Sequence, residues 1–178
     1  MRTLSWLLIA AVSVGVVFVL LGRQSPAEQG GPLAVTDPVA VEYEYAAGKE
    51  STWGSALPET TGSSAVSVTK VEPVGLVGLD VVGIQACDAS SASCSIVDSP
   101  GWPQPGITTI PVEGLRVWPA GQGPAYALQI GVRRQANAPM GIIEGLKFTY
   151  AAGGKQYEVV EPWTLRVYAP GTMPAPSS

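Results

Sequence analysis

The sequence contains no histidine, and this absence excludes several kinds of chemistry. Without imidazole there is no Ser-His-Asp triad, no Cys-His nucleophile pair and no metal site built on histidine. Charged residues are also scarce at 13% of the chain, which is about half their usual share. The 178 residues are enough for one modest domain with an appendage. We therefore expect a protein that is not an enzyme and that carries no cofactor.

The few charges are unevenly distributed along the chain. All 14 carboxylates lie after Arg23, together with eight of the ten basic residues. An acidic domain of this kind lacks the basic surface that the phosphates of a nucleic acid require. The sequence therefore predicts no nucleic-acid partner.

Residues 4–21 form an apolar run without a charge, between Arg2 and Arg23. A helix of this length spans about 27 Å, close to the roughly 30 Å of a bilayer's hydrocarbon core. The run exceeds the roughly 7–15 residues of a typical signal-peptide core, although Ser25 and Ala27 suit a cleavage site. We predict that residues 1–23 are an uncleaved signal-anchor helix in lipid. Cleavage near Ala27, which yields a secreted protein, is the alternative.

The two flanking arginines barely discriminate between the two orientations of this helix. The acidic segment that follows it, however, is typical of exported cargo. We therefore expect a single-pass plasma-membrane protein whose C-terminal domain is extracytoplasmic.

The two cysteines, Cys87 and Cys94, are separated by six residues and flanked by apolar runs. If the runs are paired strands, facing Cα atoms lie about 4.5–5.5 Å apart, within disulfide range. A metal-binding thiolate pair or a redox-active dithiol is the alternative, but CxxC spacing and a neighbouring lysine or arginine are missing. We predict a structural disulfide, in agreement with export.

Beyond the anchor, the chain divides into three parts. Residues 24–38 contain turn formers without periodicity and predict a flexible linker, and residues 169–178 are proline-rich and predict a disordered tail. Between them, residues 39–168 show a hydrophobic period of two, broken by glycine and proline turns. This pattern predicts an all-β domain, an Ig-like antiparallel β-sandwich of about 7–9 strands. The expected strands are residues 39–45, 66–69, 76–84, 126–133, 146–150, 157–159 and 163–167.

Three tryptophans stand beside turn-forming residues. Trp102 is surrounded by three prolines, Trp118 precedes Pro119, and Trp53 precedes Gly54. An indole on a rigid loop stacks on sugars or anchors a protein partner, whereas the alternative is that each ring caps the core. We take Trp102, Trp118 and Trp53 as candidate partner or glycan contacts.

The segments 141–150, 153–157 and 163–167 resemble the C-terminal third of small exported proteins of actinobacteria. Members of that group have one N-terminal hydrophobic segment and a β-sandwich of unassigned function. The resemblance implies a fold and a location, and no catalytic or binding residue.

These observations lead to one hypothesis and two alternatives. We expect a non-enzymatic, membrane-anchored β-sandwich that binds or supports a protein partner at the cell envelope. The first alternative is a cell-wall glycan-binding module that uses the loop tryptophans, and the second is a hydrolase of unrecognised type.

Overall fold

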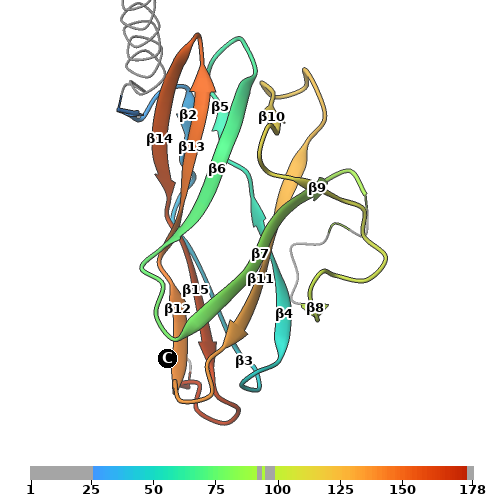
Figure 1. Ribbon diagram of the computed structural model, residues 1–178, viewed down its shortest axis with the longest axis vertical. Coiled ribbons are helices and arrows are strands. Elements are labelled where there is room, and N and C mark those ends of the chain that lie inside the picture. The colour runs from blue at the N-terminus through green and yellow to red at the C-terminus, as the bar shows by residue number, and fades with distance from the viewer. Residues whose placement is uncertain (1–25, 92–93, 95–98, 176–178) are drawn as a thin grey trace, which may run out of the picture.

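The computed structural model describes residues 26–91, 94 and 99–175, and all regular structure in these residues is β (Figure 1). The predicted membrane helix lies outside the described residues. Within them, no helix has the length and apolarity needed to cross a bilayer. The all-β class predicted from the hydrophobic period is confirmed.

The described residues contain fifteen strands, more than the 7–9 predicted, and eight of these strands have six residues or more. They are β3 (Val39–Glu44), β4 (Glu50–Ala56), β6 (Val66–Val74), β7 (Leu79–Asp88), β11 (Tyr126–Arg134), β13 (Gly145–Ala152), β14 (Lys155–Glu161) and β15 (Trp163–Tyr168). The shorter strands are β1 (Glu28–Gln29), β2 (Leu33–Ala34), β5 (Glu59–Thr60), β8 (Ser99–Pro100), β9 (Thr109–Pro111), β10 (Arg116–Val117) and β12 (Met140–Ile143).

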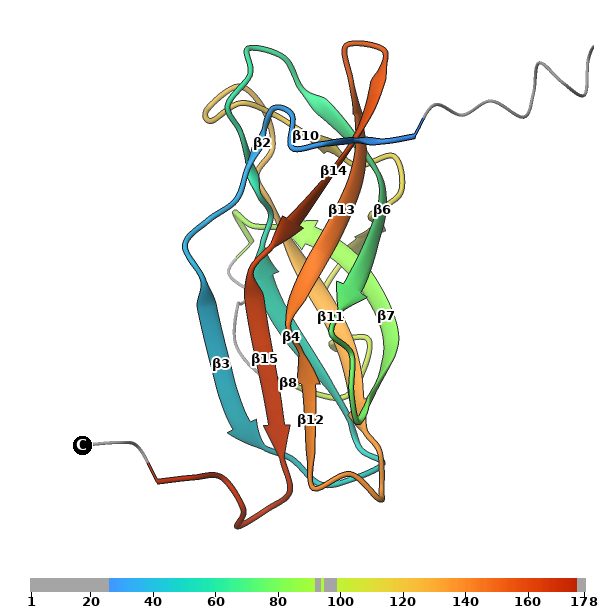
Figure 2. The same ribbon diagram turned by 90° about the vertical axis from the view of Figure 1, so that its left-hand side faces the viewer.

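The strands form several sheets that enclose one core. Two sheets have five strands each, in the orders β1-β14-β13-β6-β10 and β8-β4-β11-β7-β9. A three-stranded sheet, β12-β15-β3, and the β2-β5 pair complete the set. Figures 1 and 2 show β6, β13 and β14 on one side of the molecule and β4, β7 and β11 on the other. This layered arrangement is consistent with a β-sandwich.

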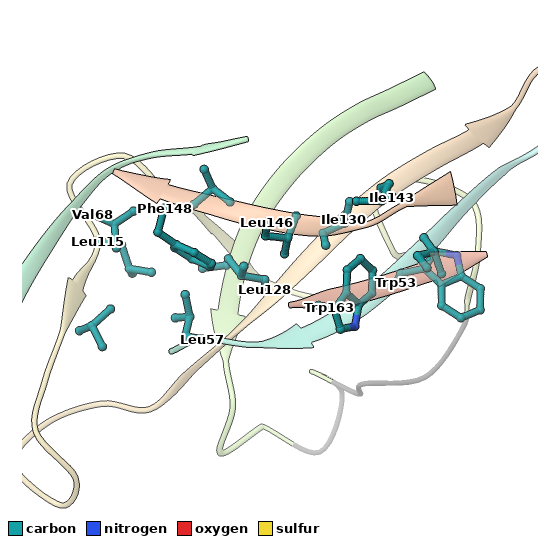
Figure 3. Close-up of a cluster of buried hydrophobic side chains, with 14 of the residues drawn as sticks. Trp53, Leu57, Val68, Leu115, Leu128, Ile130, Ile143, Leu146, Phe148 and Trp163 are labelled. Atoms are coloured by element: carbon teal, nitrogen blue, oxygen red, sulfur yellow. The ribbon is translucent and has the colours of Figure 1, made fainter. Parts of the chain in front are cut away.

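The core lies between these layers and uses alternate residues of their strands. Leu128 and Ile130 of β11 and Leu146 and Phe148 of β13 have no exposed surface. Figure 3 shows these side chains in one cluster. Complete burial of such a side chain contributes about 1.5–3 kcal/mol, so the alternation that indicated the strands also explains their stability.

The sequence led us to expect antiparallel pairing throughout, but two of the described strand pairs are parallel. β3 runs parallel to β15, and β1 runs parallel to β14. A hairpin enforces antiparallel pairing between neighbours in sequence, but these partners are joined by long stretches of chain. Their direction is therefore set by packing, which the hydrophobic period does not reveal.

The predicted linker is partly built into the domain. β1 pairs with β14, β2 pairs with β5, and Leu33 is 4% exposed. The buried Tyr150 hydroxyl donates a hydrogen bond to the Gly30 carbonyl and accepts one from the Leu33 amide at 3.3 Å. Gly31 fits closely, because a Cβ there would lie 2.5 Å from the Tyr150 Oη atom. Contacts from distant residues thus order a segment whose own composition is typical of a linker.

The predicted tail also begins with bound residues. The Met173 amide donates a hydrogen bond of 3.0 Å to the Glu44 carboxylate at the end of β3. The backbone hydrogen bonds from Gly171 and Met173 lower the pKa of Glu44. Residues 169–173 therefore continue the fold beyond β15, whereas the disordered tail had been expected to begin there.

Replacing Tyr150 by phenylalanine should release the N-terminal segment. The change removes both hydrogen bonds to that segment, each worth about 0.5–1.5 kcal/mol. Amide hydrogen exchange at residues 30–34 should accelerate about tenfold, while Tyr168→Phe, at the other end of the domain, should leave it unchanged. Unchanged exchange in Tyr150→Phe would show that the strand pairs alone hold the segment.

The same tyrosine gives the segment an alkaline pH dependence. Burial raises the pKa of Tyr150 above the usual value of 10.0, so the folded state holds the phenolic proton more tightly than the unfolded state. Its contribution to stability is therefore complete below pH 10 and is lost as the pH rises through the folded pKa. Tyr150→Phe should remove this part of the alkaline dependence.

Candidate functional site

Trp53 is a core residue, so the prediction that it is a contact residue is wrong. Its side chain is 4% exposed, and its ring stacks on Tyr43 with the centroids 3.5 Å apart. The indole N–H donates a hydrogen bond of 2.9 Å to the Ser51 hydroxyl. Gly54 beside it continues strand β4 and forms no turn, which is why the ring lies in the buried cluster of Figure 3.

Trp102 covers the outer face of the sheet that contains β7 and β11. It lies across the paired Gly83 and Gly131, where an added Cβ would be 2.6 Å and 2.3 Å from ring atoms. The preceding residue, Gly101, accepts a hydrogen bond of 2.6 Å from the Thr52 hydroxyl of β4. Trp102 is half-buried against this surface and covers the part of the sheet where the two glycines provide no side chains.

Cys87 and Cys94 form the predicted disulfide, with their Cα atoms 5.9 Å apart. The bridge is buried with Ala127 and is packed by Ile107. Because Cys87 pairs with Ala127 across β7 and β11, the bridge lies on the same outer face as Trp102. The disulfide and the indole therefore cover two parts of the same outer face.

Trp118 combines partial exposure with a position at a cavity. The cavity has a volume of about 250 Å³ and walls that are mainly apolar. Its lining comprises Ala56, Leu57, Pro58, Glu59, Val117, Trp118, Ala120, Pro124, Ala125 and Tyr126. The Arg116 guanidinium lies 4.5 Å from the centroid of the indole ring, and Gly123 also lies close to the ring. We call this site the Trp118 cavity.

A second cavity, missed by sequence reasoning, lies beside β3. It has a volume of about 240 Å³ and is lined by Thr36, Val39, Val41, Gly54, Ser55, Ala56, Glu161, Pro162 and Trp163. Glu161, at the end of β14, is 4% exposed and accepts hydrogen bonds from the Thr36 amide at 3.2 Å and from the Thr36 hydroxyl. The one signal in the sequence is a carboxylate directly before a Pro-Trp pair. We call this site the Glu161 cavity.

The chain matches no protein-family model and no curated protein. Its function is therefore argued from the geometry of the two cavities and from the sequence.

Proposed function

We propose that the protein is a non-enzymatic, membrane-anchored module with an Ig-like β-sandwich, which binds a protein partner at the cell envelope. The observation that carries the proposal is the Trp118 cavity, where a half-buried indole borders apolar walls. The uncharged run of residues 4–21 supports the anchor, and the disulfide supports an oxidising, extracytoplasmic location.

The chemistry of the Trp118 cavity favours a protein over a glycan. Tryptophan, tyrosine and arginine are the residues most enriched at energetically important points of protein interfaces, and Trp118, Tyr126 and Arg116 meet here. Glycan binding needs a free ring face for stacking. Arg116 and Gly123 already contact the ring of Trp118, so a partner side chain entering the cavity fits this site better.

The position of the cavity supports a partner in or near the same membrane. β10 pairs with the first residues of β6, and Ser67 of β6 also pairs with Ala151 beside the β13–β14 turn. β1, the first described strand after the predicted anchor, pairs near the same turn through Tyr157. The Trp118 cavity and the entry of the chain therefore lie at one end of the domain, as Figure 1 shows for β10 and the β13–β14 turn.

Site-specific photocrosslinking in native membranes tests this function. A photoreactive residue at Ala120, which lines the cavity, should yield one discrete adduct with a second protein. The same group at Asn137, an exposed residue of the β11–β12 turn, should yield none. Adding Trp118→Ala should reduce the Ala120 adduct about tenfold or more, the effect of losing an interface hot spot. Absence of an adduct, or equal adducts at both positions, would contradict the proposal.

A further inference from the structure

The Glu161 cavity contains a buried carboxylate that has no positive partner among the described residues. Both carboxylate oxygens accept hydrogen bonds, and Thr36 supplies all of the donors that the described residues provide. None of the ion pairs among the described residues includes Glu161. Burial of an ionised carboxylate without a counter-charge costs free energy, and a cation bound in the cavity would offset this cost.

The walls of this cavity suit a cation on an apolar stem. Val39 and Val41 of β3, Ala56 and Pro162 offer contact to methylene groups, as the stem of a lysine side chain requires. Trp163, at 5% exposure, adds an indole, the ring that attracts cations most strongly. A divalent metal ion needs several oxygen ligands, whereas this cavity has one carboxylate and suits one positive charge.

The surroundings of the cavity suit an extended protein segment. β3 is the edge strand of its sheet and lies at the left-hand edge of Figure 2. Three exposed valines lie at or beside the cavity. Val39 lines it and is 51% exposed, whereas Val35 and Val160, which are 47% and 45% exposed, adjoin lining residues in the sequence. An edge strand with apolar side chains beside a pocket is the arrangement that recognises a peptide in extended conformation.

We propose that the Glu161 cavity binds the alkylammonium group of a lysine side chain, presented by an extended segment of a protein partner. The ammonium group pairs with the Glu161 carboxylate, and its stem lies between β3 and Trp163. A lysine provides three donors in a compact head, which matches a single carboxylate whose other contacts come from Thr36. This site shares only Ala56 with the lining of the Trp118 cavity, and it adds a defined chemistry to the proposed function.

Titration of the full-length protein in detergent with n-butylammonium chloride tests the site directly. The reporter is the NMR resonance of the Trp163 indole N–H, with sodium chloride as the ionic-strength control and 1-butanol as the uncharged probe. We expect a saturable shift with the amine and binding of butanol weaker by about tenfold or more, the usual effect of a charged hydrogen-bonded pair. No saturable shift with the amine, or equal affinity for both probes, overturns the proposal.

Glu161→Gln separates the charge from the hydrogen bonds. Glutamine keeps an oxygen that accepts from Thr36, so the Thr36 amide resonance should persist while amine affinity falls about tenfold or more. Glu113→Gln, at an exposed carboxylate that lines neither cavity, is the matched control and should change affinity less than twofold. Unchanged amine affinity in Glu161→Gln overturns the site, and if that variant unfolds, the comparison of amine with butanol on the unaltered protein decides. Neither result depends on the photocrosslinking at Ala120, so the two proposals fail independently.

Discussion

Replacing Trp102 by alanine is expected to lower the free energy of unfolding by about 3 kcal/mol, the lower end of the range for large aromatic side chains. Trp102 lies across Gly83 and Gly131, so its removal exposes the backbone of two paired strands to solvent. The two glycines have no side chains of their own to fill the space that the ring leaves. Denaturant unfolding of the full chain in detergent, followed by circular dichroism, measures the loss.

Gly131→Ala tests the same contact from the other side. The new Cβ would lie 2.3 Å from the Trp102 ring, and such overpacking costs about 1–3 kcal/mol. Gly62→Ala is the control, because its Cβ would meet no atom closer than 3.4 Å and should change stability by less than about 0.5 kcal/mol.

The two changes at this contact should not be additive. In the Trp102→Ala background, the space that the ring leaves should accommodate the Gly131→Ala methyl group at little cost. Additive effects in this cycle would mean that the ring does not rest on Gly131.

Removal of the Cys87–Cys94 bridge is the second large effect we expect. The bridge closes a ring of about eight residues, and the chain-entropy model gives about 2.5 kcal/mol for such a ring. The double variant Cys87→Ala/Cys94→Ala should lose this amount, and a reductant should destabilise the unaltered protein equally. The same reductant should leave the double variant unchanged. A midpoint of unfolding that is insensitive to reductant in the unaltered protein would contradict a stabilising role for the bridge.

The prediction of strands from the sequence was most accurate for strands that bury only one face. In β13 and β15, apolar residues alternate with polar or small ones, and the structure buries the apolar set. The turn that joins β13 and β14 contains Gly153 and Gly154, and both have positive φ angles, +55° and +79°. Local chemistry alone specifies such elements.

Strand β4 was not predicted, because its burial does not depend on hydrophobic residues. Ser51, Thr52 and Ser55 are at most 3% exposed although all three are polar. Neighbouring strands and the loop of Trp102 cover β4, and small hydroxyl side chains fit this space. A period counted over apolar residues misses a strand of this composition, and Trp53 was placed in a loop for the same reason.

The candidate sites were only partly visible in the sequence. Trp118 was found because tryptophan beside proline is a local pattern. The environment of Glu161 is assembled from Thr36 and Val39, more than a hundred residues earlier in the chain. Contact between segments that far apart is a property of the tertiary structure, so the sequence around Glu161 does not indicate that its carboxylate is buried.

The docking of β1 onto β14 limits how far the domain can move from the bilayer. Four residues, 24–27, separate Arg23 from Glu28 in the sequence, and four residues extend at most about 14 Å, compared with about 50 Å for the fifteen residues 24–38. With the helix retained in lipid, as we propose, the protein searches for its partner by lateral diffusion, in two dimensions and at a nearly fixed height. Short tethers of this kind raise the effective concentration of proteins that share the membrane, and a moderate intrinsic affinity then suffices for assembly.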